Sequence, residues 1–198
     1  MTWKLAAALG VPAAVLAALV AGGWGSLQDV DASAVRTLTL DSGLARDLVL
    51  GVTQLGAPLL LEVVTLVGAV ALLRRGSSRV AVHALLAVFG AEVLSSGLKA
   101  LIGRSRPCEA LLHCPVTTSF PSGHATGAAA FWVTLAVLLL PRVGRRSWWL
   151  LAVPAAVALS RVLLGVHYPS DVVGGLLVGG CWAVTCAAAI GRVRARAG

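Results

Sequence analysis

Long apolar stretches alternate with short polar breaks along the whole chain of 198 residues. Six of the stretches approach the roughly 20 residues that a helix needs to cross the hydrocarbon core of a bilayer. They cover residues 5–20, 48–73, 80–102, 122–140, 148–164 and 169–190. The pattern predicts an all-α fold, a bundle of about six transmembrane helices, in which residues 1–198 form one integral membrane domain.

The composition favours a membrane protein over a soluble helical one. Hydrophobic residues make up 58% of the chain, charged residues make up 12%, and the mean hydropathy is +0.90. Soluble domains usually contain about 25% charged residues. A soluble bundle with this sequence would have no polar helix faces to turn towards water.

The first apolar stretch has two interpretations. A single lysine precedes it and small residues at 21–23 follow it, which is also the pattern of a cleaved signal peptide. We expect the stretch to remain as the first transmembrane helix, because six spans place both termini on one side of the membrane. The positions of the basic residues require the same arrangement.

The net charge of +8 carries information about orientation in the membrane. Basic residues concentrate at the N-terminus, in two alternate short connections and at the C-terminus: Lys4; Arg74, Arg75 and Arg79; Arg142, Arg145 and Arg146; Arg192, Arg194 and Arg196. Short cytoplasmic segments are enriched in Lys and Arg in this way. We therefore predict a multi-pass protein of the plasma membrane with both termini in the cytoplasm, and no nucleic-acid partner.

Three polar clusters lie at the ends of predicted spans, all on the extracytoplasmic side. They consist of Lys99, Arg106 and Pro107; of Pro121, Ser122, Gly123 and His124; and of Ser160, Arg161, His167 and Asp171. In the second cluster, Ser122 is expected to cap the helix that follows, whose first N–H groups favour an anion. Folding can bring the clusters together, and a phosphoryl group needs such cationic donors, a nucleophile and a proton donor.

The three clusters resemble the tripartite signature of the type 2 phosphatidic-acid phosphatase superfamily, which comprises integral membrane lipid phosphatases. This superfamily shares its phosphate pocket with vanadium haloperoxidases and bacterial acid phosphatases. Every residue of the pattern is present, and the motifs extend roughly from Lys99 to Asp171. The resemblance implies hydrolysis of a phosphomonoester or diphosphate of a membrane lipid at the outer face. Phosphatidic acid, phosphatidylglycerophosphate and polyprenyl diphosphate are the candidate substrates.

The resemblance also implies a role for each residue. His167 would attack phosphorus and form a phosphohistidine, while Asp171, one helical turn further on, would fix the tautomer of its ring. His124 would protonate the leaving group and then help to activate water. The phosphoryl oxygens would be bound by Lys99, Arg106, Ser122, Gly123 and Arg161. We expect Arg104, which lies close by, to help bind a headgroup.

No cofactor or metal ion is implied. Asp171 and Glu109 are the only carboxylates in the central outer clusters, which are too few for a two-metal phosphatase. The cations occupy the positions where a metal ion would otherwise neutralise the phosphate.

Two other functions remain open at this point. The same pocket could serve a lipid phosphotransferase, in which an alcohol instead of water resolves the phosphohistidine. It could also belong to a transporter or a non-catalytic membrane protein that binds an anion, because isolated basic residues at helix ends commonly extend to the membrane interface without further function.

Several residues have alternative interpretations. A disulfide between Cys108 and Cys114 would close the outward loop in an oxidising compartment, although His113 between them also gives a weak metal-binding pattern. Gly175 and Gly179 permit close helix packing, which we expect within the bundle, with a homo-oligomer as the alternative. Glu62 and Glu92 are intramembrane carboxylates with structural or orienting roles. The polar connector 25–47 is expected to form in part an amphipathic helix at the membrane surface.

Overall fold

The computed structural model describes residues 3–107 and 117–196. The predicted Cys108–Cys114 disulfide, its alternative metal pattern with His113, and Glu109 lie outside the described residues. Cys181 and Cys186 both have free thiols, Cys186 being buried in the bundle.

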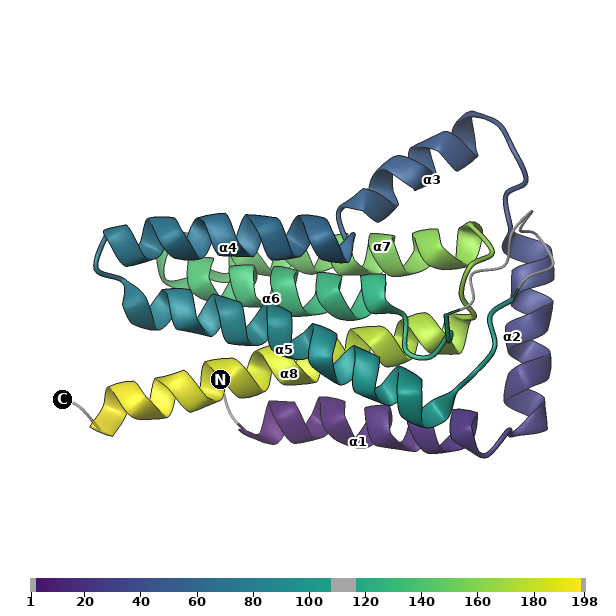
Figure 1. Ribbon diagram of the computed structural model, residues 1–198, viewed down its shortest axis with the longest axis horizontal. Coiled ribbons are helices and arrows are strands. Elements are labelled where there is room, and N and C mark those ends of the chain that lie inside the picture. Colours follow the sequence, from purple (N-terminus) through teal and green to yellow (C-terminus); the bar gives the residue numbers. More distant parts are fainter. Residues whose placement is uncertain (1–2, 108–116, 197–198) are drawn as a thin grey trace.

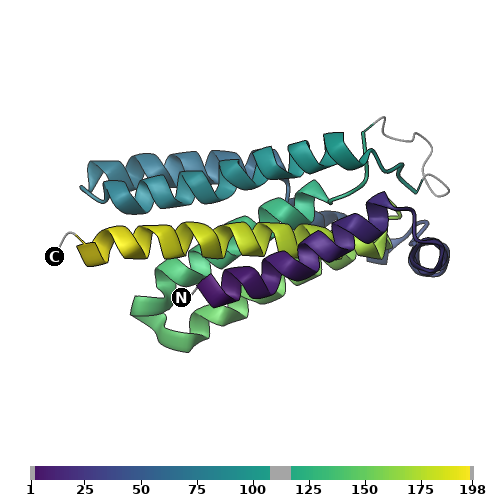
Figure 2. The ribbon, with the colours of Figure 1, turned by 90° about the horizontal axis from the view of Figure 1, so that it is seen from below.

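The described residues form helices and connections, without a strand (Figure 1). The helices are α1 (Trp3–Ala21), α2 (Gly25–Leu38), α3 (Leu44–Gln54), α4 (Pro58–Arg74), α5 (Ser78–Ile102), α6 (Gly123–Val143), the 3₁₀ helix η1 (Gly144–Leu151), α7 (Ala152–Leu163) and α8 (Pro169–Arg196). Helix α8 is central, because α1, α5, α6 and α7 all pack against it (Figure 2). The predicted all-α membrane bundle is confirmed.

Five segments of the described chain are long and apolar enough to cross a membrane. One of them, Gly123–Leu163, contains α6, η1 and α7, and the chain reverses within it so that α7 packs beside α6 (Figure 1). The bundle therefore makes six passes, through α1, α4, α5, α6, α7 and α8. This agrees with the number of spans predicted from the apolar pattern.

The boundaries of three predicted spans differ from those in the structure. The stretch 48–73 is divided between α3 and α4, which meet at an angle (Figure 1), because Pro58 begins α4 and the residue before it, Ala57, has an extended backbone. The stretch 148–164 begins inside η1 and becomes α-helical only at Ala152. Helix α6 continues through Pro141 to Val143, so this proline lies in its last turn and does not end it.

The polar connector between the first two spans is largely helical. Helix α2 crosses one end of the bundle, almost perpendicular to the long helices (Figure 1). Its inward side buries Asp31 and Val35, which lie one turn apart, while most of its other residues are exposed. The predicted amphipathic helix is confirmed, and its buried side carries a carboxylate.

Two glycines allow α8 to approach α6 closely. A Cβ atom at Gly175 would lie 2.7 Å from the carbonyl oxygen of Ser122, and one at Gly179 would lie 2.2 Å from that of Thr126. Such separations are far below van der Waals contact, so only glycine permits this packing. The expectation that this pair serves packing within the bundle is confirmed.

We predict that Gly179→Ala destabilises the protein by roughly 1–3 kcal/mol, because the new methyl group must push α6 away from α8. The thermal unfolding midpoint of the purified protein in detergent measures this effect. Gly97→Ala is the matched control, since Gly97 is exposed on α5 and a Cβ atom there meets no atom within 4 Å. Equal midpoints for the two variants would contradict the packing described here.

Candidate active site

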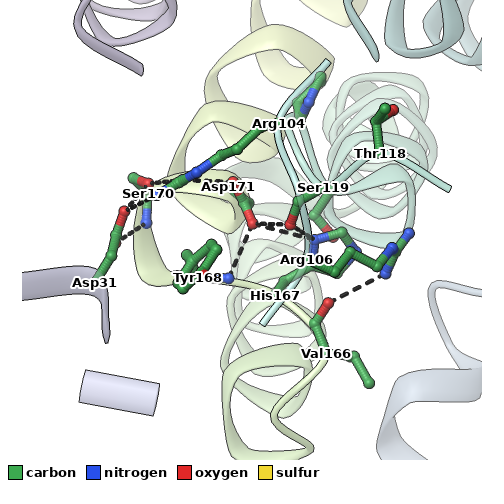
Figure 3. Close-up of polar contacts among 12 residues, drawn as sticks. Asp31, Arg104, Arg106, Thr118, Ser119, Val166, His167, Tyr168, Ser170 and Asp171 are labelled. Carbon is green, nitrogen blue, oxygen red and sulfur yellow. Dashed lines mark hydrogen bonds and ion pairs between the residues drawn. The ribbon is translucent and has the colours of Figure 1, made fainter. Parts of the chain in front are cut away.

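The three polar clusters meet at the end of the bundle that α2 crosses (Figures 1 and 3). Lys99 lies in the last turn of α5, His124 in the first turn of α6, and Arg161 in the last turn of α7. His167 precedes α8 and Asp171 lies in its first turn. Segment 103–122, which connects α5 to α6, adds Arg106, Ser122 and the residues around them.

His167 and Asp171 form the contact that their spacing predicts. His167 Nδ1 lies 3.4 Å from Asp171 Oδ2, and both side chains are almost completely buried, with exposed fractions of 1% and 0%. Asp171 Oδ2 also accepts hydrogen bonds from the Ser119 hydroxyl and from the Tyr168 backbone N–H, the latter at 2.9 Å (Figure 3). The carboxylate is thus fixed from several sides.

The neighbours of His167 determine where its ring proton lies. Arg106 Nη1 is 3.0 Å from His167 Nε2, and a guanidinium can only donate, so Nε2 accepts and Nδ1 carries the proton. Burial lowers the pKa of His167 to about 4, although Asp171 acts in the opposite direction. The ring is therefore neutral at pH 7, with a lone pair on Nε2 directed towards a cation.

Lys99 holds the segment that precedes α6. Its Nζ donates to the carbonyl oxygens of Thr118, at 3.2 Å, and Ser119, at 3.5 Å, and to that of Pro121. These bonds place an ammonium group at the base of the site and fix the chain just before Ser122.

Arg161 is anchored by a residue that the sequence did not suggest. Its Nη1 donates at 3.0 Å to the hydroxyl of Thr53, a residue of α3 that is only 2% exposed. Its Nε is buried and has no hydrogen-bond partner among the described residues. One edge of the guanidinium is thus held, and Nε remains available for an acceptor.

The start of α6 provides further donors. Ser122 occupies the N-cap position, but its hydroxyl does not cap the helix, contrary to the expectation from sequence. Its Oγ is instead buried without a partner among the described residues. The first N–H groups of a helix also have no partner within it. An anion beside His124 would satisfy these donors, and the charged groups acting on His124 are the cations Arg161, Arg106 and Lys99.

The sequence led us to expect that Arg104 helps to bind a headgroup. Its guanidinium instead pairs with two carboxylates of the protein. Its Nη2 lies 2.7 Å from Asp31 Oδ2, and its Nη1 lies 2.8 Å from Asp171 Oδ1 (Figure 3). Burial disfavours the charged guanidinium, but Asp171 and Asp31 outweigh that effect and raise the pKa of Arg104. Asp31, Thr53 and Ser119 had no predicted role, because no sequence spacing connects them to the site.

Two further carboxylates lie within the bundle, and one of them, Glu92, acts electrostatically on Lys99 of the site. Glu62 of α4 and Glu92 of α5 are half-buried and act on each other electrostatically across the two helices. In the described part of the chain, no group of three or more His, Cys, Asp or Glu side chains could hold a metal ion.

Comparison with known proteins identifies relatives of the chain. A family model described as the PAP2 superfamily matches residues 80–195. The decaprenylphosphoryl-5-phosphoribose phosphatase of Mycobacterium tuberculosis is 38% identical over 139 residues, which cover 68% of this chain and 74% of that protein. Phosphatidylglycerophosphatase B of Bacillus subtilis is 35% identical over 138 residues, covering 65% of this chain and 67% of that protein.

A solved structure has the same fold over almost the entire chain. It is the crystal structure of a transmembrane PAP2-type phosphatidylglycerolphosphate phosphatase from Bacillus subtilis. The TM-score is 0.82 at 26% sequence identity, and the match covers 95% of this chain and 96% of that one.

We predict that Thr53→Val weakens the binding of orthophosphate roughly tenfold, because Arg161 loses the hydrogen bond that orients it. Isothermal titration calorimetry on the purified protein measures this affinity. Thr53→Ser retains the hydroxyl and is expected to bind nearly as well as the unmodified protein. If the valine variant binds equally well, Thr53 does not orient an anion-binding Arg161.

Proposed function

Because the chain belongs to the PAP2 superfamily of lipid phosphatases, we propose that it hydrolyses the phosphate group of a membrane lipid through a phosphohistidine on His167. The chain is a phosphoric ester hydrolase with a multi-pass membrane fold. The proposal adds a mechanism without a metal ion, an orientation in the membrane and a class of substrate. The observation that carries it is the buried neutral His167, with Nε2 facing a guanidinium and Nδ1 facing Asp171.

In the first proposed step, His167 Nε2 attacks phosphorus. The N–P bond forms as the bond between phosphorus and the leaving oxygen breaks, and His124 gives that oxygen a proton. As the imidazole acquires positive character, the proton on Nδ1 stays in place and Asp171 stabilises it. The Arg106 guanidinium, which now contacts Nε2, would donate to a phosphoryl oxygen instead.

In the second proposed step, water attacks the phosphohistidine. His124 accepts a proton from the water, the O–P bond forms, and the N–P bond breaks to release orthophosphate and neutral His167. Three cations would hold the phosphoryl oxygens through both steps: Lys99, Arg106 and Arg161. Two donors at the start of α6, the Ser122 hydroxyl and the Gly123 N–H, would add hydrogen bonds. Positive charges fixed in advance supply the stabilisation that metal ions give in other phosphatases.

The relatives suggest the kind of lipid. Their names specify a decaprenyl-linked phosphoribose and phosphatidylglycerophosphate, which share a terminal phosphate on a membrane-anchored molecule. We propose a substrate of that class, with phosphatidic acid and polyprenyl diphosphate as further members to be tested. Its apolar chains would remain in the bilayer while its phosphate reaches the end of the bundle.

The orientation rests on the ends of the helices. The α4–α5 and α6–α7 connections lie at the end of the bundle away from the site, as does the end of α8 (Figure 1). The sequence is rich in arginine in both connections and near the C-terminus. By the positive-inside rule we place this end in the cytoplasm and the site on the extracytoplasmic side.

We predict that the detergent-purified protein releases orthophosphate from at least one lipid in a panel of these substrates, with or without a chelator. Quenching with alkaline detergent during turnover of a ³²P-labelled lipid should trap a phosphoprotein that is stable to base and labile to acid, as phosphohistidines are. His167→Ala should abolish both signals in protein that remains folded, although its thermal midpoint should fall because Asp171 loses a buried donor.

The outcomes separate the candidate functions. Release that requires an added metal ion would overturn the metal-free mechanism. Release that persists in His167→Ala would overturn the assignment of the nucleophile. Phosphate transfer to an added alcohol in preference to water would favour the phosphotransferase, and orthophosphate binding without turnover of any lipid would favour an anion-binding protein.

The topology gives a separate prediction. Reporter fusions at Gly76 and Gly198 should be active only as cytoplasmic reporters, whereas a fusion at Gly43, between α2 and α3, should be active only as an extracytoplasmic one. The reverse pattern would place the site in the cytoplasm.

A further inference from the structure

A second set of polar contacts lies behind Asp171, on the side away from His167. Asp31 of α2 is 1% exposed and accepts the Ser170 backbone N–H at 3.0 Å and the Ser170 hydroxyl. Arg104 bridges this carboxylate to Asp171, and its Nη1 also donates to Ser170 Oγ at 2.6 Å. Four side chains from α2, segment 103–122 and α8 thus form one connected network (Figure 3).

The network includes two carboxylates and one guanidinium. Its formal charge is therefore −2 + 1 = −1, which equals the charge that Asp171 would have alone. Without Asp31, the positive charge of Arg104 would cancel the negative charge of Asp171. The Arg104–Asp171 pair that faces His167 would then have no net charge. Asp31 is the residue that prevents this cancellation.

We propose that Asp31 is a positioning residue for the reaction: through Arg104 it maintains the negative charge with which Asp171 supports the imidazole of His167. This inference rests on the proposed function. It gives α2 a role in catalysis that acts through Arg104 and Asp171. It also explains why Arg104 faces two carboxylates and not a headgroup.

The role follows from the charge that the reaction creates. His167 becomes positively charged when Nε2 binds phosphorus, and a net negative group at Nδ1 lowers the energy of that state. The other charged groups acting on His167 are Arg106 and Arg161, both cations that oppose it, with Lys99 near His124. Asp171 is therefore the direct source of negative charge at the ring, and its partner Arg104 must be neutralised elsewhere.

The test uses charge-neutralising variants of nearly unchanged shape. Asp31→Asn should lower kcat on the order of tenfold and leave KM unchanged, since the lost charge acts on the imidazole through Arg104 and Asp171 while the phosphate-binding cations are untouched. Removal of a negative charge also makes the imidazole harder to protonate. The ratio of kcat/KM at pH 4 to kcat/KM at pH 7 should therefore rise above that of the unmodified protein.

Arg104→Gln should shift the same ratio in the opposite direction. Removal of the cation makes His167 easier to protonate, so activity is lost at higher pH and the ratio falls. The double variant Asp31→Asn/Arg104→Gln again has a net charge of −1 at Asp171, and its ratio should return towards that of the unmodified protein. The ionisation of the substrate phosphate is common to all variants and does not affect the comparison.

Asp29→Asn is the matched control. It removes the same charge from the same helix, but from an exposed side chain that solvent screens, so kcat and the pH ratio should stay unchanged. If Asp31→Asn does not fold, Arg104→Gln and the double variant still test the inference. The ratio of kcat/KM at pH 4 to that at pH 7 should fall in Arg104→Gln and return towards the unmodified value in the double variant.

Three results would overturn the inference. The first is that Asp31→Asn leaves both kcat and the ratio of kcat/KM at pH 4 to that at pH 7 unchanged. The second is that Asp31→Asn and Arg104→Gln shift this ratio in the same direction. The third is that kcat falls only in proportion to a fall in the thermal unfolding midpoint. The last two results would reduce Asp31 and Arg104 to a structural connection between α2 and α8. A failure of the proposed function is recognised separately, because the unmodified protein would then release no phosphate or His167→Ala would stay active, and the inference would fall with it.

Discussion

Asp171 is completely buried, and a carboxylate without water must receive donors from the protein on every side. The protein supplies these donors from distant parts of the chain. Arg104 binds one oxygen, while Ser119, the Tyr168 N–H and His167 surround the other. If any of these groups were displaced, a buried charge would lose part of its compensation, which is far more costly than the loss of a surface contact. The arrangement of the end of the bundle that α2 crosses is constrained by this requirement.

The packing of α6 against α8 makes the compensation possible. Gly175 and Gly179 bring the two helices close enough for the Ser122 N–H to donate to the Asp171 carbonyl oxygen at 3.0 Å. The start of α6, with His124, is thereby fixed relative to the start of α8, with Asp171. Two helices pressed together through small residues cannot slide independently, so His124 and Asp171 keep their relative positions.

The sequence predicts those parts of the molecule that local patterns encode. Apolar length gives the six passes, and the four-residue spacing between His167 and Asp171 places them in contact. The partners of the cations could not be predicted in this way. Arg104 pairs with a residue 73 positions earlier and Arg161 with one 108 positions earlier, and no periodicity connects such residues. The break between α3 and α4 does have a local signal in Pro58, which cannot continue α3 and which disfavours a helical residue before it.

The connection of Asp31 to Ser170 spans 139 positions, so it links an early part of the chain to the last helix. During synthesis, the first helices enter the membrane long before α8 leaves the ribosome, and until then the carboxylate on α2 lacks its partner Ser170. The reactive centre is therefore assembled only at the end of biogenesis. A partly synthesised chain already contains several of the arginines and His124, but it lacks both His167 and the buried carboxylate that contacts it.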